Sequence, residues 1–569
     1  MDKAPQPRRV FLKQAAFAGA ALGLPGTASA QAAGRADSTT AFLEIRRDPD
    51  TVMVETAAHV EALSRSRDEW RGSGVVVTTV RAGAALNVRL SAPDARIKRV
   101  QLRWRGDMRA MRIMLGDAWE RAYGDLEWRG MAPDRAMPWY FAGYDGRATH
   151  AYGVRTSPGA FCFWRVDDEG ISLVADVRSG GSALALGGRV LDVCTVVCRE
   201  GRAGESAFAA LHAFCREMCA HPRMPAQPVF GSNDWYWAYG KNSAQSIRSD
   251  ALRIVELSPG GSILPFAVID DGWQPERADK AQVGRWDRAN AKFGDIAAVA
   301  ADVRRAGARP GIWIRPLLAS SDTPDAWRLT RDRRFLDPSV PDAAAKIAAD
   351  IARLRGWGFD LLKHDYTTFD LSGRWGFQMG TALTQDGWTF AGGPSRTTAE
   401  VIADLYRGIR TAAGDALIIG CNTVSHLSAG VFDICRIGDD TSGTDWSRTR
   451  RMGVNTLAFR GVQHGAFYAA DADCVGVSTA IPWTFNRQWL DLAARSGTTL
   501  FVSLAPEAVG ADETRDLRAA LATAAANQPL GEPIDLERTI WPSAWRLGGR
   551  EARYDWVGAD GVSLQGATT

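Results

Sequence analysis

The sequence predicts a multidomain protein with an N-terminal antiparallel β-sandwich, a central (β/α)8 barrel and a small C-terminal β module. Its 569 residues are too many for one compact core. Short strand-like runs separated by turn residues fill the first third of the chain, whereas apolar runs alternating with helical patterns fill the middle. After residue 525 a few more strand-like runs follow. These three changes of pattern predict the three parts.

The first 30 residues are predicted to be a twin-arginine export signal. Arg8 and Arg9 begin the motif RRVFLK, a short apolar run follows, and the small residues ASA end at Ala30. We therefore expect cleavage after Ala30 and a periplasmic or secreted protein. The apolar run is too short to cross a bilayer, and the sequence has no other stretch of about 20 apolar residues. No membrane span is predicted.

The charge balance argues against a nucleic-acid partner. The net charge is +3, and the four basic residues and one acidic residue of the leader account for all of it. The rest of the chain is close to neutral, whereas nucleic-acid binding requires a basic surface. Whether the protein forms a homo-oligomer stays open.

Residues 31–225 are predicted to form the β-sandwich. Runs such as SGVVVTTVRAG, LNVRLSA and IKRVQLRWRG follow one another with Gly, Asp or Pro between them, which is typical of an antiparallel sandwich. A helical segment, SAFAALHAFCREMCA, then leads to the linker at 221–228.

The cysteines of this helical segment raise metal binding as an alternative. Cys215 and Cys219 are four residues apart, and His212 and His221 are close in sequence. The spacing fits no zinc pattern well, and buried thiols are common, so a structural role is the preferred interpretation.

Residues 226–512 are predicted to form the barrel and residues 513–569 the C-terminal β module. Eight apolar runs occur in the barrel region, and helical patterns such as IAAVAADVRRAG and AEVIADLYRGIRTAAG lie between several of them and end in Gly. The active site of such a barrel lies at the C-terminal ends of its strands. The polar residues that end each apolar run are therefore the site candidates.

These candidates come from five consecutive runs. They are Asp270 and Asp271 on the second run, Trp313 and Arg315 on the third, Lys363 and Asp365 on the fourth, Cys421 and Asn422 on the fifth, and Arg436, Asp439 and Asp440 on the sixth. Because side chains alternate along a strand, Lys363 and Asp365 are expected on one face and His364 on the other, toward the helices.

Carboxylates and aromatic residues without histidine pairs favour glycoside hydrolysis. The chain has only seven His, and the barrel region contains neither H-x-H nor H-x-x-x-H, so neither a metal nor an organic cofactor is expected. In glycoside hydrolysis one carboxylate attacks the anomeric carbon and a second carboxyl group protonates the leaving oxygen. Each motif alone fits a salt-bridged loop equally well. Their order on the second, fourth and sixth runs favours a site.

Several motifs resemble the α-galactosidases of glycoside hydrolase family 36, in clan D. The resemblance covers about residues 228 to 510, and its motifs, in the family's order, are GSNDWYWAYGKNS, VIDDGWQ, GIWIRP, LLKHDY, GC at 420–421, RIGDDT and DADC. It implies a retaining exo-glycosidase that removes terminal α-linked galactose, or a close galacto-configured sugar, from oligosaccharides by double displacement.

The resemblance also implies roles for individual residues. Asp365 is implied to be the nucleophile and Asp440 the general acid/base. Substrate-binding roles are implied for Asp270, Asp271, Lys363, Arg436, Trp235, Trp313, Cys421 and Asn422. Lys363 and Arg436 are further expected to keep Asp365 ionised, and burial or the neighbouring anions Asp439 and Asp365 to keep Asp440 protonated.

The sequence differs from the family pattern at three places. The fifth-strand loop reads CNTVSHLSAG, so Asn422 and His426 are expected to change the substituent accepted at position 2 of the sugar. Arg315 opens the option of a charged substrate. Because Asp439 and Asp440 are adjacent, either could be the general acid/base. Strand parity with Arg436 favours Asp440.

Two other functions remain as alternatives. One is a raffinose-synthase-like α-galactosyl transferase, in which a sugar hydroxyl replaces water. The other is a non-catalytic glycan-binding protein, against which the presence of both Asp365 and Asp440 argues.

Overall fold

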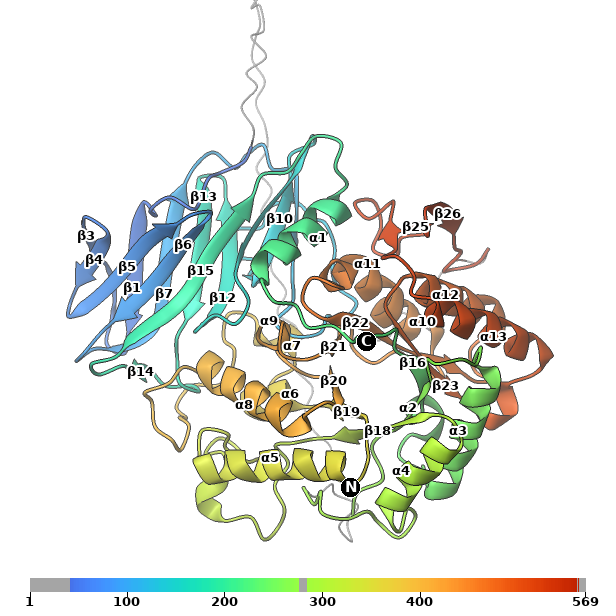
Figure 1. The fold of residues 1–569 in the computed structure, drawn as a ribbon. Coiled ribbons are helices and arrows are strands. Elements are labelled where there is room, and N and C mark those ends of the chain that lie inside the picture. The colour runs from blue at the N-terminus through green and yellow to red at the C-terminus, as the bar shows by residue number, and fades with distance from the viewer. Residues whose placement is uncertain (1–40, 276–283, 560, 562–569) are drawn as a thin grey trace, which may run out of the picture. The chain divides into compact units, whose positions relative to one another are not determined.

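Two antiparallel sheets form the N-terminal part of the computed structural model, which describes residues 41–275, 284–559 and 561 (Figure 1). The predicted leader lies outside these residues. One sheet has the order β2 (Val60–Ala62), β1 (Thr51–Thr56), β7 (Arg96–Arg105), β13 (Gly170–Asp176), β12 (Phe161–Asp167) and β9 (Met137–Pro138), with β14 (Leu184–Ala185) paired to β7. The other has the order β3 (Ser64–Ser66), β4 (Glu69–Gly72), β5 (Val75–Ala82), β6 (Ala85–Ser91), β15 (Val190–Arg199), β11 (Thr149–Val154), β10 (Tyr140–Tyr144) and β8 (Ile113–Gly116).

Eight parallel strands close into a barrel after this sandwich. In chain order they are β16 (Phe230–Asn233), β17 (Phe266–Ile269), β18 (Arg309–Ile314), β19 (Leu361–His364), β20 (Leu417–Gly420), β21 (Ile434–Arg436), β22 (Ala469–Val477) and β23 (Thr499–Leu504). Each of the eight predicted apolar runs contains one of them. The strands are short and almost entirely buried, since side chains fill the barrel and helices cover it.

The main helices around the barrel are α3 (Ala244–Leu257), α4 (Ile296–Arg305), α5 (Pro341–Gly356), α8 (Thr398–Ala413), α12 (Trp483–Arg495) and α13 (Ala511–Ala525). Local sequence sets their ends: α8 begins with a capping box of Thr397 and Glu400 and ends at Gly414, whose φ is +61°. Helix α13 spans the predicted domain boundary at 512 and packs on α12 and α3. A three-stranded antiparallel sheet follows: β24 (Glu532–Pro533), β25 (Ala544–Leu547) and β26 (Arg550–Arg553). The predicted fold class is confirmed.

The sandwich and the barrel share one hydrophobic core. A single cluster of buried apolar residues includes Trp104 of β7, Trp313 of β18 and Trp545 of β25. The segment between β8 and β9 also joins the barrel. Ala122 in this segment forms an isolated β-bridge with Gly438, through hydrogen bonds from Ala122 N to Ile437 O (2.9 Å) and from Asp439 N to Ala122 O (2.8 Å). We call residues 117–136 the inserted loop.

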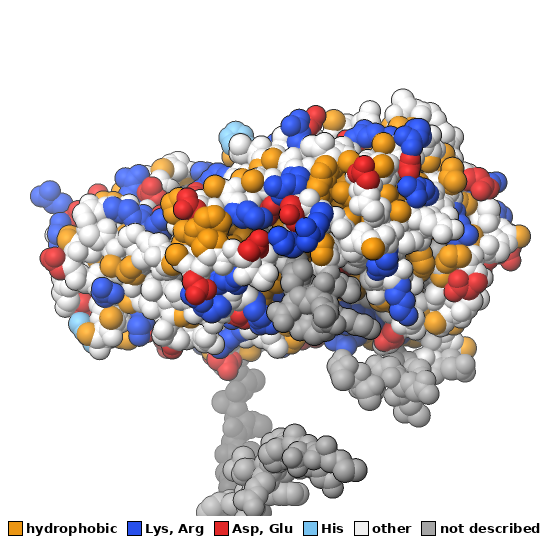
Figure 2. Space-filling view, turned by 90° about the horizontal axis from the view of Figure 1, so that it is seen from below, with side chains coloured by type: hydrophobic (Ala, Val, Ile, Leu, Met, Phe, Trp, Pro, Cys, Tyr) orange, Lys and Arg blue, Asp and Glu red, His pale blue; other side chains and the backbone are white. Residues whose placement is uncertain are grey.

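The surface carries mixed charge. In the face shown in Figure 2, Lys and Arg side chains are interspersed with Asp and Glu. No helix in the described part of the chain is both long and apolar enough to cross a bilayer. All eight cysteines are buried and free.

Candidate active site

The predicted site residues gather where the barrel strands end. Asp270 directly follows β17, Asp365 follows β19, and Asp440 lies four residues after Arg436, the last residue of β21. Neighbouring parallel strands place their carboxyl ends at one edge, so these side chains come from the same mouth of the barrel. His364 points away from it, as predicted: its buried ring packs edge-on against Tyr406 of α8.

Two hydrogen bonds orient Asp365. The indole Nε1 of Trp313 donates to Asp365 Oδ2 (3.0 Å), and the backbone N of Tyr366 donates to Oδ1 (2.8 Å). Tyr366 has a φ of +64°, a conformation that non-glycine residues rarely adopt. The sharp turn after β19 therefore aims the carboxylate. Trp313 is 1% exposed, so it acts on Asp365 through its N–H rather than as an open wall.

Lys363 pairs with Asp270. Asp270 Oδ2 accepts from Lys363 Nζ (2.6 Å) and from Asn233 Nδ2 (2.8 Å), and Oδ1 accepts from Asp271 N (2.8 Å). The partner of the ammonium group is thus Asp270, and the expectation that Lys363 keeps Asp365 ionised stays a prediction. Asp270 is only 3% exposed, and a carboxylate that is so deeply buried requires a charged partner.

Asp271 carries a raised pKa. Burial raises the pKa of its carboxyl to about 6, with smaller contributions from the negative charges of Asp270 and Asp365, although the hydrogen bond from Gln274 opposes the shift.

Asp440 lies between two guanidinium groups. Arg121 Nη1 and Arg436 Nη2 are each 3.3 Å from Asp440 Oδ1. Burial favours a higher pKa, but the positive charges of Arg121 and Arg436 outweigh it and lower the pKa of Asp440 to about 2. The expectation that burial and anionic neighbours keep Asp440 protonated was therefore wrong for this structure. The charged groups in contact with Asp440 are both cations.

Sequence reasoning missed Arg121, which the inserted loop brings into the barrel. Arg121 Nη2 is 2.6 Å from Asp439 Oδ1, and Arg121 Nη1 is 3.6 Å from Cys421 Sγ. Arg436 Nη1 lies at the same distance from this sulfur atom. The only local signal was a dense mixture of charged and aromatic residues, DAWERAY, in a segment without strand or helix periodicity.

The neighbouring Glu120 was also missed. Its buried carboxylate accepts hydrogen bonds from Asn422 Nδ2, from the hydroxyl of Tyr123 and from Gly376 N (2.8 Å). Burial raises the pKa of Glu120. Asn422 Oδ1 in turn accepts from Phe369 N (3.0 Å). Asn422 is fully buried, so these contacts make it a support of the site wall.

Two expectations about substrate selectivity do not match the structure. His426 is fully buried, stacks on Trp139 and bonds to Val154 O (2.7 Å), so it lies in the core shared with the sandwich rather than beside the sugar. The Arg315 guanidinium pairs with Asp370 (2.6 Å) and lies 4.1 Å from the ring centre of Tyr366. Its charge is therefore balanced within the protein.

A cavity of about 740 Å³ opens at this end of the barrel. Its walls come from the inserted loop, from the segment after β19 and from the segment after β21; they include Arg121, Tyr123, Tyr366, Trp375, Phe377, Asp439, Asp440, Arg448 and Arg451. Trp235, at the start of the short helix α2 (Trp235–Ala238), is half-buried and packs edge-on against Tyr239.

Tyr366 links Asp365 to this cavity. Its pKa is raised, first by burial and then by the negative charge of Asp365, with a further contribution from Asp440. Burial, and after it the negative charge of Asp365, raises the pKa of Cys421, whose sulfur atom lies 3.6 Å from both Arg121 Nη1 and Arg436 Nη1. Tyr366 and Asp440 both line the cavity, and Asp365 is joined to it through its hydrogen bond with the backbone N of Tyr366.

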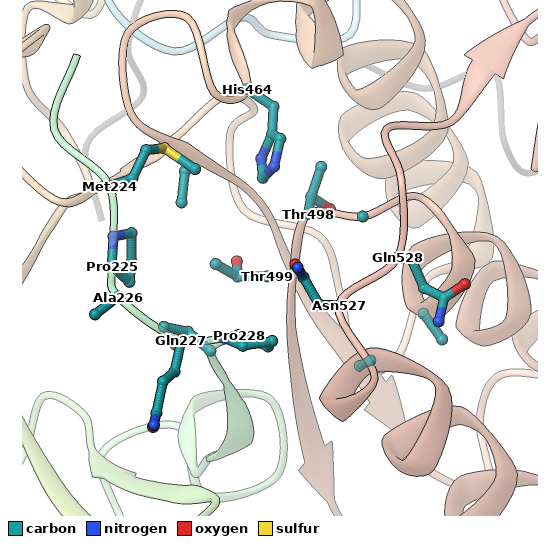
Figure 3. Close-up of a pocket in the computed structure, with 15 residues that line it drawn as sticks. Met224, Pro225, Ala226, Gln227, Pro228, His464, Thr498, Thr499, Asn527 and Gln528 are labelled. Atoms are coloured by element: carbon teal, nitrogen blue, oxygen red, sulfur yellow. The ribbon is translucent and has the colours of Figure 1, made fainter. Parts of the chain in front are cut away.

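A second cavity lies at the opposite end of the barrel. It has a volume of about 180 Å³, and its lining includes Ala469 and Thr499, the first residues of β22 and β23, beside His464 and Asn527 (Figure 3). No acidic residue lines it, so it lacks the groups that glycoside hydrolysis requires.

Within the described residues, no group of three or more His, Cys, Asp or Glu side chains is placed to hold a metal ion. The cysteines of α1 (Ala207–Met218) and its C-cap, Cys215 and Cys219, are buried in the hydrophobic core, and His212 Nδ1 is 2.9 Å from Val462 O.

Solved structures with similar folds include α-galactosidases. TtGalA, an alpha-galactosidase from Thermus thermophilus in complex with p-nitrophenyl alpha-D-galactopyranoside, matches with a TM-score of 0.55 and 18% identity, over 89% of this chain and 99% of that chain. The GH36 alpha-galactosidase AgaA from Geobacillus stearothermophilus matches with a TM-score of 0.56 and 16% identity, over 85% and 71%. The galactosidase domain of the alpha-galactosidase-sucrose kinase AgaSK matches with a TM-score of 0.53 and 18% identity, over 82% and 68%.

These similarities show that the chain has the fold of glycoside hydrolase family 36 structures. No family model matches the chain, and no curated protein matches it. The fold implied by the sequence resemblance is thus confirmed by structure, at identities too low to transfer an activity.

Proposed function

We propose that the protein is a retaining exo-glycosidase that hydrolyses terminal α-linked galactose, or a close galacto-configured sugar, from oligosaccharides. The observation that carries this proposal is the cavity at the carboxyl ends of the barrel strands, which is lined by Asp440 and by Tyr366, whose backbone N donates to Asp365. The fold shared with α-galactosidase structures supports it.

The reaction proceeds in two steps. Asp365 attacks the anomeric carbon, the bond to the leaving oxygen breaks, and the proton of Asp440 passes to that oxygen. Water then attacks the anomeric carbon, Asp440 takes the proton of the water molecule, and Asp365 leaves as a carboxylate. Trp313 and Tyr366 hold Asp365 for the attack. We assign the binding of the sugar hydroxyls to Lys363, Asp270 and Asp271.

Export through the leader at 1–30 is also part of the proposal. Fractionation of the producing cell tests it.

An α-galactoside chromogen, offered with and without a second sugar, tests the function. Release of galactose into water supports the hydrolase. A new oligosaccharide in the presence of the acceptor supports the transferase, and binding without release supports a glycan-binding protein.

Replacement of the nucleophile tests the mechanism. We expect Asp365→Asn to lower kcat by at least about 10³-fold, because the amide cannot form the glycosyl ester. Sugar binding, measured by calorimetry, should survive, since Lys363 and Asp270 pair with each other and not with Asp365. Activity close to that of the wild type would remove Asp365 from its role.

A further inference from the structure

Six side chains of alternating charge form a continuous ladder across the barrel mouth. In order they are Arg448, Asp439, Arg121, Asp440, Arg436 and Asp473. Arg448 Nη2 is 2.8 Å from Asp439 Oδ2, and Arg436 Nη2 is 2.9 Å from Asp473 Oδ2. Only Arg121 comes from the sandwich part of the chain. The first four members line the cavity.

Arg121 is held more tightly by one partner than by the other. Its contact with Asp439 is short, 2.6 Å, and a second arginine, Arg448, holds the other oxygen atom of Asp439. Its contact with Asp440 is 3.3 Å. Asp439 therefore holds the Arg121 side chain in place, whereas the longer contact between Arg121 and Asp440 is the one that can be broken.

The free side of Asp440 faces the cavity. The Asp440 side chain is 37% exposed, and both of its arginine contacts use Oδ1. Among the contacts found in the described part of the chain, none uses Oδ2. That oxygen atom is placed to meet a leaving group or a water molecule while Oδ1 stays between the guanidinium groups.

We propose that Arg121 is a positioning residue that holds Asp440 in its ionised form. This form serves as the base of the second step, whereas the first step needs the protonated form, which Arg121 disfavours. This inference rests on the proposed function. A carboxylate between two cations gives up its proton readily, so the first step is the step that Arg121 slows, and the second is the step that it favours.

The charged and titratable groups around Asp440 determine this balance. They are Arg121 and Tyr123 of the inserted loop, Tyr236 of α2, Lys363 and Tyr366 at β19, Arg436 and Asp439 at β21, and Arg448 of α10 (Trp446–Thr449). The four cations, Arg121, Lys363, Arg436 and Arg448, all disfavour the protonated form of Asp440. Of the four, Arg121 lowers the pKa of Asp440 the most.

Substrates that differ in their need for a proton test the role of Arg121. Methyl α-galactoside has a basic leaving group that requires protonation, whereas p-nitrophenyl α-galactoside has an acidic one that requires it much less. In the wild type, kcat/KM for the methyl glycoside should fall as the pH rises through the acidic range, more steeply than for the aryl glycoside. In Arg121→Gln this fall should move upward by about 1 to 3 pH units.

Three further variants make the test specific. Arg121→Lys keeps the cation, so its pH profile should stay near that of the wild type. Asp440→Ala removes the acid and should depress the methyl glycoside far more than the aryl one, with no falling limb left to move. Arg448→Gln removes the next cation along the ladder and should move the fall by a smaller step than Arg121→Gln.

The outcomes separate the inference from the proposed function. A wild type that releases nothing from either glycoside overturns the proposed function. If the wild type turns over the aryl glycoside but the falling limb is the same in Arg121→Gln, the role of Arg121 is overturned. Should Arg121→Gln fail to fold, an unmoved limb in Arg448→Gln has the same meaning.

Discussion

Asp271 is a site residue whose negative charge destabilises the folded protein. Its pKa rises to about 6 from an ordinary value of 3.8, first through burial. The folded state therefore binds a proton more tightly than the unfolded state, and stability falls as the pH rises from about 4 to about 6. Above pH 6 the whole penalty is present. At about 1.4 kcal/mol per pKa unit it amounts to about 3 kcal/mol.

The variant Asp271→Asn should therefore be more stable than the wild type at neutral pH, by up to about 3 kcal/mol. The gain should shrink as the pH falls below 6, because the wild-type carboxyl then becomes neutral as well. Urea unfolding at a series of pH values measures it. Asp415→Asn serves as the control, since Asp415 is exposed and paired with Arg355, and it should give no gain. A pH-independent difference for Asp271→Asn would contradict the charge penalty.

At the scale of elements, the barrel was predictable because its signals are local. Strand β19 and its charged end are contiguous in sequence, and alternation along the strand alone separates Lys363 from His364. The inserted loop has no such signal. Arg121 meets Asp440 across 319 positions, and that contact depends on how the sandwich packs on the barrel. Ion-pair partners such as Lys363 and Asp270 were missed for the same reason, because spacing shows which face a charge occupies but not which opposite charge lies nearest.

The bridge between the inserted loop and the segment after β21 depends on Gly438. A Cβ atom at this position would lie 2.4 Å from Met452 O and 2.3 Å from Thr456 Oγ1. A backbone oxygen cannot rotate away, so the segment between Arg436 and Asp440 would have to shift.

We expect Gly438→Ala to cost about 1 to 3 kcal/mol of unfolding free energy and to lower kcat/KM, because the shift separates Asp440 from Arg121. Gly408→Ala in α8 is the matched control: nothing lies within 4 Å of a Cβ atom there, so stability should be equal or higher. Equal stability and activity in both variants would show that the loop tolerates displacement.

At the scale of the whole molecule, one buried ion pair ties the sandwich to the barrel. Asp117 begins the inserted loop, and its Oδ1 lies 2.8 Å from Nε of Arg460, the last residue of α11 (Thr456–Arg460). Both side chains are buried, at 2% and 0% exposure, and Gln463 Nε2 also donates to Asp117 (3.1 Å). Burial raises the pKa of Asp117, against the opposing charge of Arg460.

Removing one partner of this pair leaves the other charge buried without compensation. We expect Arg460→Met to lose about 3 to 5 kcal/mol of unfolding free energy, and the double variant Arg460→Met with Asp117→Asn to regain a part of it, since a neutral amide costs less to bury. The exposed pair of Arg515 with Asp512 gives the control, and Arg515→Met should change stability by less than about 1 kcal/mol.

Because the Asp117–Arg460 pair and the shared core connect the sandwich and the barrel, the wild type should unfold in a single calorimetric transition. Two separate transitions in the wild type, or a double variant no more stable than Arg460→Met, would mean that the sandwich and the barrel hold their folds independently and that the inserted loop is attached to the site only by its own contacts.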